Sequence, residues 1–243
     1  MANVHMILQG KGGVGKSFIA SLLAQHKTSD ETKVLSIDTD PVNATFAGFK
    51  ALNVKRLELM DGDVINARKF DDLIELIASS KTDIIIDNGA STFIALSHYL
   101  ISNHIASMLK ELGHTLVIHT VITGGQAFQD TLNGFNQLIK HFSSDVKIVV
   151  WLNPYWGNII IEGKSFEELK VYQENKKKVS AIVRIPDFKE ETFGEDLKEM
   201  LKERLTFNEA IPKKELTIMM RQRLKIISSQ LFKQLDNLEA ALS

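Results

Sequence analysis

The feature that most constrains this chain is an eight-residue segment, Gly10–Ser17, with the sequence GKGGVGKS. It matches the pattern G-x-x-x-x-G-K-[ST] at every fixed position, and it lies between the apolar run Val4–Leu8 and the helix-like stretch Gly15–His26. Glycines let the backbone curl so that successive N–H groups face a phosphate chain at the positive end of a helix. We therefore expect a phosphate-binding loop between a strand and a helix.

The side chains of this loop fit the chemistry of a nucleoside triphosphate. Lys16 would supply a positive charge between the β- and γ-phosphates, and the Ser17 hydroxyl would occupy one position around Mg²⁺. A glycine-rich turn that binds nothing is the alternative. The residues expected to surround the phosphates are Gly10, Gly12, Gly13, Val14, Gly15, Lys16, Ser17 and Phe18.

Short apolar runs alternate with helix-length segments along most of the chain. The apolar runs are Val4–Leu8, Val34–Ile37, Asp83–Ile86, Thr115–Val121, Val146–Leu152 and Ala181–Ile185. The helix-length segments are Gly15–His26, Ala67–Ser79, Phe93–Leu112, Gln126–Phe142 and Ser165–Lys178. Because the runs are continuous rather than alternating, they suit parallel strands covered on both faces. We predict an α/β fold: a doubly wound, mainly parallel sheet with helices on both faces and any ligand along one edge.

The end of the chain predicts an amphipathic helix over residues 215–243. Apolar residues repeat there at steps of three and four, which gathers them on one helix face. From Pro212 onward basic residues outnumber acidic ones. The helix could therefore lie on a membrane surface, face DNA, or pack its apolar stripe on the sheet with a solvated basic face. No linker or repeat interrupts the sequence, and we expect one domain over 1–243.

Composition excludes several classes of function. The 243 residues include no cysteine, which excludes disulfides, thiol catalysis, iron–sulfur clusters and cysteine-ligated zinc. The net charge of −1 argues against a whole-protein electrostatic grip on nucleic acid. No uncharged apolar run approaches the roughly 18 residues that cross a bilayer, and the N-terminal residues lack the pattern of a signal peptide. We expect a cytoplasmic protein.

Three aspartates follow directly on predicted strands. Asp38 and Asp40 come after the second apolar run, and Asp87 ends the third. Side chains at the carboxyl ends of parallel strands point into the ligand edge of the sheet. Asp87 fits the pattern in which a carboxylate holds Mg²⁺ through its water shell. Asp38 and Asp40 could instead be turn formers before Pro41.

The segment Lys11–Ser17 resembles the deviant Walker A loop of the ParA/MinD class of P-loop ATPases. The resemblance implies ATP as the substrate, ADP as the product, Mg²⁺ as the cofactor and a homodimer in the ATP-bound state. It implies that Lys11 crosses the dimer interface to the partner's nucleotide and acts with Lys16 in catalysis. It also makes Asp40 the residue that holds the attacking water, and Asp38 a Mg²⁺ ligand through water.

Two further positions resemble the purine-binding elements of the same class. Asn153 follows the fifth apolar run and resembles a base-binding asparagine. Pro186 follows the sixth and resembles a proline-containing loop on the other side of the base. A turn explains either residue as well. The segment Asn88–Ser91 could form the switch II region, although it lacks the prolines that most relatives have there.

Longer segments resemble one group within that class, the TraL proteins of plasmid conjugation regions. These segments are residues 37–46, 54–63, 87–91, 150–157, 191–194 and 221–226. The resemblance implies a role with a conjugative plasmid or a type IV secretion locus, and a conjugation or secretion component as a partner. It leaves DNA or membrane contact open.

Two other functions are compatible with the same loop. A binding module could hold nucleotide without useful turnover, but a pure sensor has no need of the Asp40 carboxylate. A small-molecule kinase or ligase would need an acceptor pocket and an arginine-rich lid, yet Arg56 and Arg68 are the only arginines before Arg184. We expect a slow, Mg²⁺-dependent ATPase that acts as a dimerisation switch.

Overall fold

A seven-stranded sheet forms the centre of the computed structural model, which describes residues 2–29 and 33–242. The strand order is β11-β8-β7-β1-β6-β2-β3, and every neighbouring pair is parallel. The strands are β1 (Ala2–Ile7), β2 (Leu35–Asp38), β3 (Lys55–Arg56), β6 (Ile84–Asp87), β7 (His114–Thr123), β8 (Lys147–Asn153) and β11 (Val179–Arg184). Because the order reverses at β1, the predicted doubly wound parallel sheet is confirmed.

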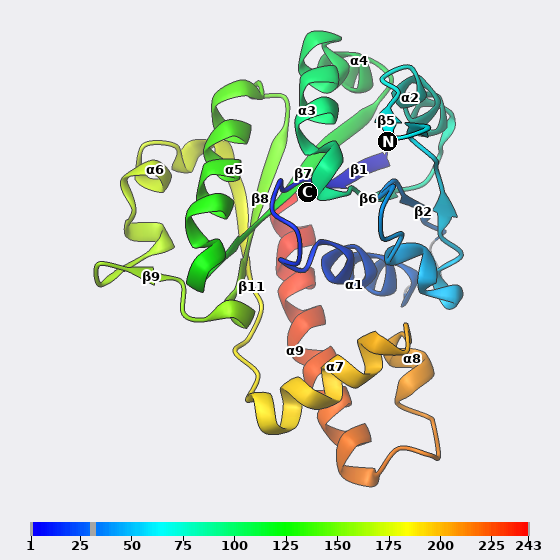
Figure 1. Cartoon of the computed structure of the whole chain (residues 1–243), viewed down its shortest axis with the longest axis vertical. Helices are drawn as coiled ribbons and strands as arrows, with labels where there is room; N and C mark the ends of the chain where they lie inside the picture. Colours follow the sequence, from blue (N-terminus) through cyan, green and yellow to red (C-terminus); the bar gives the residue numbers. More distant parts are fainter. Residues whose placement is uncertain (1, 30–32, 243) are drawn as a thin grey trace.

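Helices cover both faces of the sheet (Figure 1). One face carries α2 (Lys69–Ser79), α3 (Phe93–Ser102), α4 (Ile105–Glu111) and α5 (Phe128–His141). The other carries α1 (Lys16–Ser29), α7 (Glu195–Lys202), α8 (Phe207–Ala210) and α9 (Ile218–Leu242). Along β6, Ile84 and Ile86 pack into the first layer and Ile85 into the second. Each face of the sheet thus buries apolar side chains beneath its helices. Since both faces are covered, apolar residues follow one another along the strands.

The helix predicted over 215–243 is α9, which begins at Ile218; the last residue of the predicted range lies outside the described residues. Its apolar stripe is buried in the core against α1 and β11. The stripe consists of Met220, Leu224, Ile227, Leu231, Leu235, Leu238 and Leu242. Each of these large side chains stabilises the fold by about 1.5–3 kcal/mol when fully buried. The stripe is therefore part of the protein core, with the basic residues of the helix outside it.

Two of the predicted helices differ from the structure. The stretch Phe93–Leu112 is broken between α3 and α4, where the side-chain amide of Asn103 caps the carbonyl of Tyr99, 2.9 Å away. His104 then takes a left-handed backbone with φ +52°, which no helix can continue.

The predicted helix Ser165–Lys178 is wrong. A capping box at Ser165 starts a short 3₁₀ turn, and only α6 (Lys170–Gln173) is α-helical. The side-chain amide of Asn175 donates to the carbonyl of Val171, 2.9 Å away, and takes that acceptor from the helix. Two short hairpins were not predicted: β4 (Met60–Asp61) with β5 (Val64–Ile65), and β9 (Ile160–Ile161) with β10 (Lys164–Ser165).

The pairing register places the C-terminal ends of β1, β2 and β6 at the same level. Ile7 of β1 and Asp38 of β2 both pair with Asp87 of β6. The loop after β1 and the two acidic strand ends therefore lie at the same level on one edge of the sheet. Within residues 2–29 and 33–242, no helix has the length and apolar character to cross a membrane.

Candidate functional site

The loop after β1 adopts the conformation that its glycines predict. Gly13 and Gly15 have φ angles of +72° and +97°, which side chains of L-residues disfavour. A Cβ atom at Gly15 would lie 2.9 Å from the side-chain amide nitrogen of Asn153, and one at Gly10 would lie 3.0 Å from the ring of Phe93. The loop thus needs glycine both for its turns and for close neighbours, and it leads directly into α1 at Lys16.

Lys16 lies at the N-terminus of α1 with its ammonium folded back over the loop. The ammonium donates to the carbonyl of Lys11 at 2.9 Å. Burial lowers the pKa of Lys16, while the negative charges of Asp87 and Asp40 oppose that shift. A buried cation at the positive end of a helix attracts an anion strongly. The position therefore suits a phosphate group.

Asp87 is the least satisfied polar group at this edge. It is buried, and neither carboxylate oxygen has a hydrogen-bond partner within the described residues. Burial raises the pKa of Asp87 to about 7. The nearby Ser17 hydroxyl acts against this shift because it favours the charged carboxylate, although it does not form a hydrogen bond of good geometry with it. The charge of Asp38 raises the pKa of Asp87 further. A buried carboxylate without partners is costly unless a cation approaches it.

These groups fit a hydrated Mg²⁺ ion bound together with a nucleotide. Mg²⁺ keeps several waters and is held in proteins by one or two carboxylates and by substrate phosphates. Ser17 and Asp87 supply a hydroxyl and an orphaned carboxylate on neighbouring elements. Among the described residues no three histidine, aspartate or glutamate side chains form a metal site alone. Waters and phosphate oxygens would complete such a shell.

Asp38 has its oxygens engaged by the backbone of the following segment. One oxygen accepts from the N–H of Asp40 at 2.9 Å and the other from the N–H of Ala47 at 2.8 Å. Burial raises the pKa of Asp38, and these two N–H groups act against that shift. The carboxylate thus stabilises the turn from β2 to the 3₁₀ turn Phe46–Gly48. If Asp38 also accepted hydrogen bonds from metal-bound waters, it would do so with oxygens that already accept backbone N–H groups.

Asp40 lies in the same turn and faces the loop. Its Oδ1 accepts from the N–H groups of Val42 at 2.9 Å and Asn43 at 3.3 Å. A Cβ atom at Gly89 would lie 2.7 Å from this oxygen, so the segments after β2 and β6 touch at a position that only glycine fits. Asp40 is therefore held in place from two sides.

Lys11 points away from its own phosphate loop. Its ammonium forms an ion pair with Asp130 of α5 at 2.8 Å, and both side chains are about half exposed. Asn153 lies beneath the loop, where its amide donates to the carbonyl of Val14 at 3.0 Å and its oxygen accepts from the N–H of Tyr155 at 3.2 Å. The Trp156 indole donates to Gly13 at 3.1 Å.

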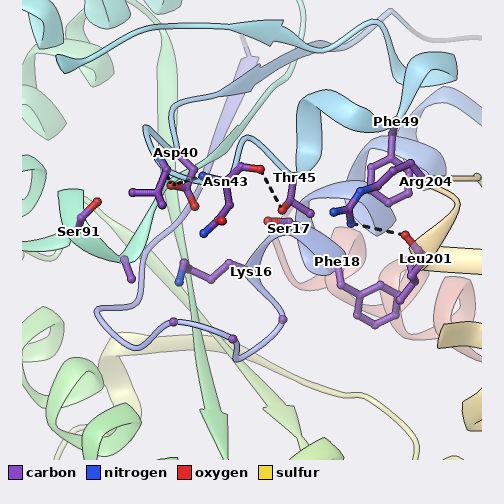
Figure 2. A pocket seen from close by; sticks show the side chains of 15 residues that line it. Lys16, Ser17, Phe18, Asp40, Asn43, Thr45, Phe49, Ser91, Leu201 and Arg204 are labelled. Atoms are coloured by element: carbon purple, nitrogen blue, oxygen red, sulfur yellow. Dashed lines mark hydrogen bonds between the residues drawn. The ribbon is translucent and has the colours of Figure 1, made fainter. Parts of the chain in front are cut away.

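A cleft of about 490 Å³ lies against the loop (Figure 2), a size typical of small-molecule sites. Its lining brings together six residues predicted to surround the phosphates, Asp40, six further residues from the segments after β2 and β6, and two residues from α7 and the connection that follows it. The lining residues are Gly12, Gly13, Gly15, Lys16, Ser17, Phe18, Asp40, Val42, Asn43, Thr45, Phe49, Ala90, Ser91, Leu201 and Arg204.

Several predicted residues lie outside that lining. Gly10, Lys11 and Val14 belong to the same loop, and Asp38 and Asp87 end the strands beneath the cleft. Asn153 supports the loop from β8, and Pro186 follows β11 half-buried. Sequence reasoning missed Leu201 and Arg204, since no local motif marks residues that reach the cleft from so far along the chain.

Comparisons with known proteins identify the family of this chain. The family model described as CobQ/CobB/MinD/ParA nucleotide binding domain matches residues 5–231. Two proteins of Escherichia coli, each named Protein TraL, are 62% and 61% identical to this chain over 237 and 236 residues. These alignments cover 98% and 97% of this chain, and 98% of each relative.

Solved structures share the fold at low sequence identity. The MinC:MinD cell division protein complex of Aquifex aeolicus matches with a TM-score of 0.56 and 14% identity, over 94% of this chain and 96% of that chain. The MinD cell division protein of the same organism matches with a TM-score of 0.50 and 15% identity, over 96% and 98%. The chain therefore belongs to the CobQ/CobB/MinD/ParA nucleotide-binding domain family, within which it groups with the TraL proteins.

Proposed function

We propose that this protein is a Mg²⁺-dependent ATPase that forms a homodimer in its ATP-bound state and serves plasmid conjugation or type IV secretion. The observation that carries the proposal is the buried, unpartnered carboxylate of Asp87 beside the Ser17 hydroxyl and the Lys16 ammonium. A lone phosphate would be repelled by that carboxylate, whereas a phosphate chain that carries Mg²⁺ would satisfy it.

Hydrolysis in this site would depend on positioning and charge. Water attacks the γ-phosphorus, the bond from that phosphorus to the β–γ bridging oxygen breaks, and ADP and inorganic phosphate leave. Asp40 would orient the water with its Oδ2, because Oδ1 already accepts two backbone N–H groups. Lys16 would neutralise charge on the phosphates. Bound Mg²⁺ would supply further charge neutralisation to the same oxygens.

The dimer and the cellular role rest on different support. Lys11 is about half exposed, so it could reach a second copy after leaving Asp130. The link with conjugation rests on the high identity to the TraL proteins over nearly the whole chain.

Light scattering and phosphate release together test the proposal. With Mg²⁺-ATP, the wild type should double in mass and release phosphate slowly. Asp40→Asn should double in mass without releasing phosphate, and Lys11→Ala should bind nucleotide but stay monomeric. A wild type that binds ATP yet keeps its mass and releases no phosphate would contradict both the switch and the ATPase.

A nucleotide-binding module without turnover is the second candidate. The observation that favours it is the engagement of Asp40 Oδ1 by its own turn, which a purely structural aspartate would also show. Equal phosphate release by the wild type and Asp40→Asn, at the background rate of a Lys16→Ala control, would decide for this candidate.

A further inference from the structure

Arg204 lies at one end of the cleft, opposite Ser91 (Figure 2). It belongs to the connection between α7 and α8, more than 180 residues beyond the phosphate loop. In Figure 2 its guanidinium points from that end toward Thr45 and Ser17. A side chain from the C-terminal part of the chain thus reaches into the same cleft as the loop.

The charge of Arg204 is not neutralised by the protein. Within residues 2–29 and 33–242 the guanidinium forms no ion pair, and the contact of its Nη1 with the carbonyl of Leu201 is long, at 3.5 Å. The lining of the cleft includes two cations, Lys16 and Arg204, against the single carboxylate of Asp40. The cleft therefore favours an anionic ligand at both positions.

The backbone at Arg204 is held in a conformation that arginine disfavours. Its φ angle is +56°, in the left-handed region where glycine is the usual residue. This conformation ends α7, because the N–H groups of Arg204 and Leu205 donate to the carbonyls of Leu201 and Met200, each at 3.1 Å, and such a helix cap has a left-handed residue. Here an ion pair of Glu203 with Lys213 at 2.9 Å and a capping box between Thr206 and Glu209 hold the flanking backbone.

The stem of Arg204 lies across the segment that follows Asp40. A Cβ atom at Gly48 would be 3.1 Å from Cγ of Arg204 and 3.3 Å from its Nε. Gly48 thus leaves room for the stem, and this packing directs a side chain that is otherwise exposed. A pre-oriented guanidinium loses less entropy when it binds an oxyanion.

We propose that Arg204 is a second phosphate anchor of this cleft, which binds phosphate oxygens of the nucleotide held by Lys16 and Ser17. The planar guanidinium presents paired donors that match two oxygens of a phosphate. This inference rests on the proposed nucleotide binding and adds a residue to it. It gives the C-terminal part of the chain a direct contact with the ligand.

Two substitutions separate the binding role from a structural one. Arg204→Ala removes the side chain and keeps the unfavourable φ, whereas Arg204→Gly removes both. Lys202→Ala, at the exposed end of α7, is the matched control for charge. Calorimetric titration with Mg²⁺-ADP, a non-hydrolysable ATP analogue and pyrophosphate should show binding at least about tenfold weaker in both Arg204 variants, the loss expected for a hydrogen bond to a charged group. Lys202→Ala should bind as the wild type does.

Thermal unfolding without ligand supplies the second readout. Arg204→Gly should melt at least about 2 °C above Arg204→Ala, because glycine relieves the backbone while both variants lack the side chain. Wild-type affinity in either Arg204 variant would overturn the inference and leave the proposed function intact. Weakened ADP binding with unchanged pyrophosphate binding would also overturn it, since the contact would then be to the nucleoside. Failure of the wild type to bind any of the three ligands would instead reject the proposed function.

Discussion

The ammonium of Lys11 lies 2.8 Å from the carboxylate of Asp130, in the first turn of α5. The residue that the family resemblance assigns to the partner's nucleotide is thus bound within its own subunit. Both side chains are about half exposed, so the pair is weak, and an exposed ion pair is worth about 0–1 kcal/mol. In the proposed dimer Asp130 would therefore compete with the second subunit for Lys11 without preventing its release.

Asp130→Asn should favour the ATP-bound dimer. The substitution removes the competing charge in both subunits, and the dimer dissociation constant should fall by up to about 25-fold, or about fivefold for each pair released. Asp145→Asn is the matched control, since it removes a similar surface pair with Lys110, 2.7 Å long, away from the loop. Light scattering over a range of protein concentrations with Mg²⁺ and a non-hydrolysable ATP analogue measures the effect. Equal constants for Asp130→Asn and Asp145→Asn would show that the intramolecular pair does not restrain Lys11.

The binding of Mg²⁺-nucleotide should strengthen as pH rises from 6 to 8. The pKa of Asp87 is about 7, so below pH 7 a proton must leave before the carboxylate can face a cation. Affinity should rise by up to about tenfold per pH unit below pH 7 and level off above it. Titration of Mg²⁺-ADP at several pH values tests this, with Asp87→Asn expected to bind weakly and without pH dependence. A wild-type affinity that is flat across this range would contradict the role of Asp87.

Asp87→Asn should also make the ligand-free protein more stable at neutral pH. The folded protein holds a proton on Asp87 between the ordinary aspartate pKa of 3.8 and about 7, where the unfolded chain does not. The free energy of unfolding therefore falls as pH rises through this window, by a few kcal/mol in all. The asparagine variant lacks that loss, and urea unfolding at pH 7.5 should show a higher midpoint than for the wild type.

A buried chain of three rings should make the fold sensitive to acid. The Trp151 indole donates to Nδ1 of His119 at 2.9 Å, so His119 carries its proton on Nε2 and donates to Nδ1 of His5, also at 2.9 Å. Burial lowers the pKa of both histidines well below 6.5. Below pH 6.5 the two histidines are protonated in the unfolded chain but stay neutral in the folded core. The free energy of unfolding therefore falls as pH falls.

The slope of that loss should be up to about 2.7 kcal/mol per pH unit for two histidines. Urea unfolding between pH 7.5 and 5 in the Asp87→Asn background isolates it, since Asp87 acts with the opposite sign in this range. His5→Gln should roughly halve the slope, while His141→Gln, which replaces an exposed histidine at the end of α5, should leave it unchanged. An unaltered slope in His5→Gln would mean that the chain of rings tolerates protonation.

The predictable parts of this protein are those that local sequence determines. The loop Gly10–Ser17 was predictable because its glycines allow the backbone to turn and because the segments on either side of it read as a buried strand and a helix. The three aspartates were predictable as neighbours because parallel strands end at one edge. Arg204 was not, since its place beside Gly48 depends on how α7 packs against the same face of the sheet as α1. The ion pair of Lys11 with Asp130 was missed as well, since it depends on how α5 packs beside the loop.

Gly89→Ala should impair hydrolysis more than binding. A Cβ atom at this position would lie 2.7 Å from Oδ1 of Asp40 and 3.1 Å from the ring of Pro41, so the segments after β2 and β6 must separate. Lys16 and Ser17 lie on another element and keep their positions, so the affinity for Mg²⁺-ADP should change by less than about threefold. The turnover rate should fall by about 100-fold or more, because displacement of a catalytic group by about 1 Å has that effect. Gly62→Ala, at a glycine with open space around it, is the control for a glycine substitution that leaves Asp40 in place. If Gly89→Ala turns over ATP at the wild-type rate, the contact between Gly89 and Asp40 does not position the water-binding group, and the assignment of Asp40 to catalysis loses its main geometric support.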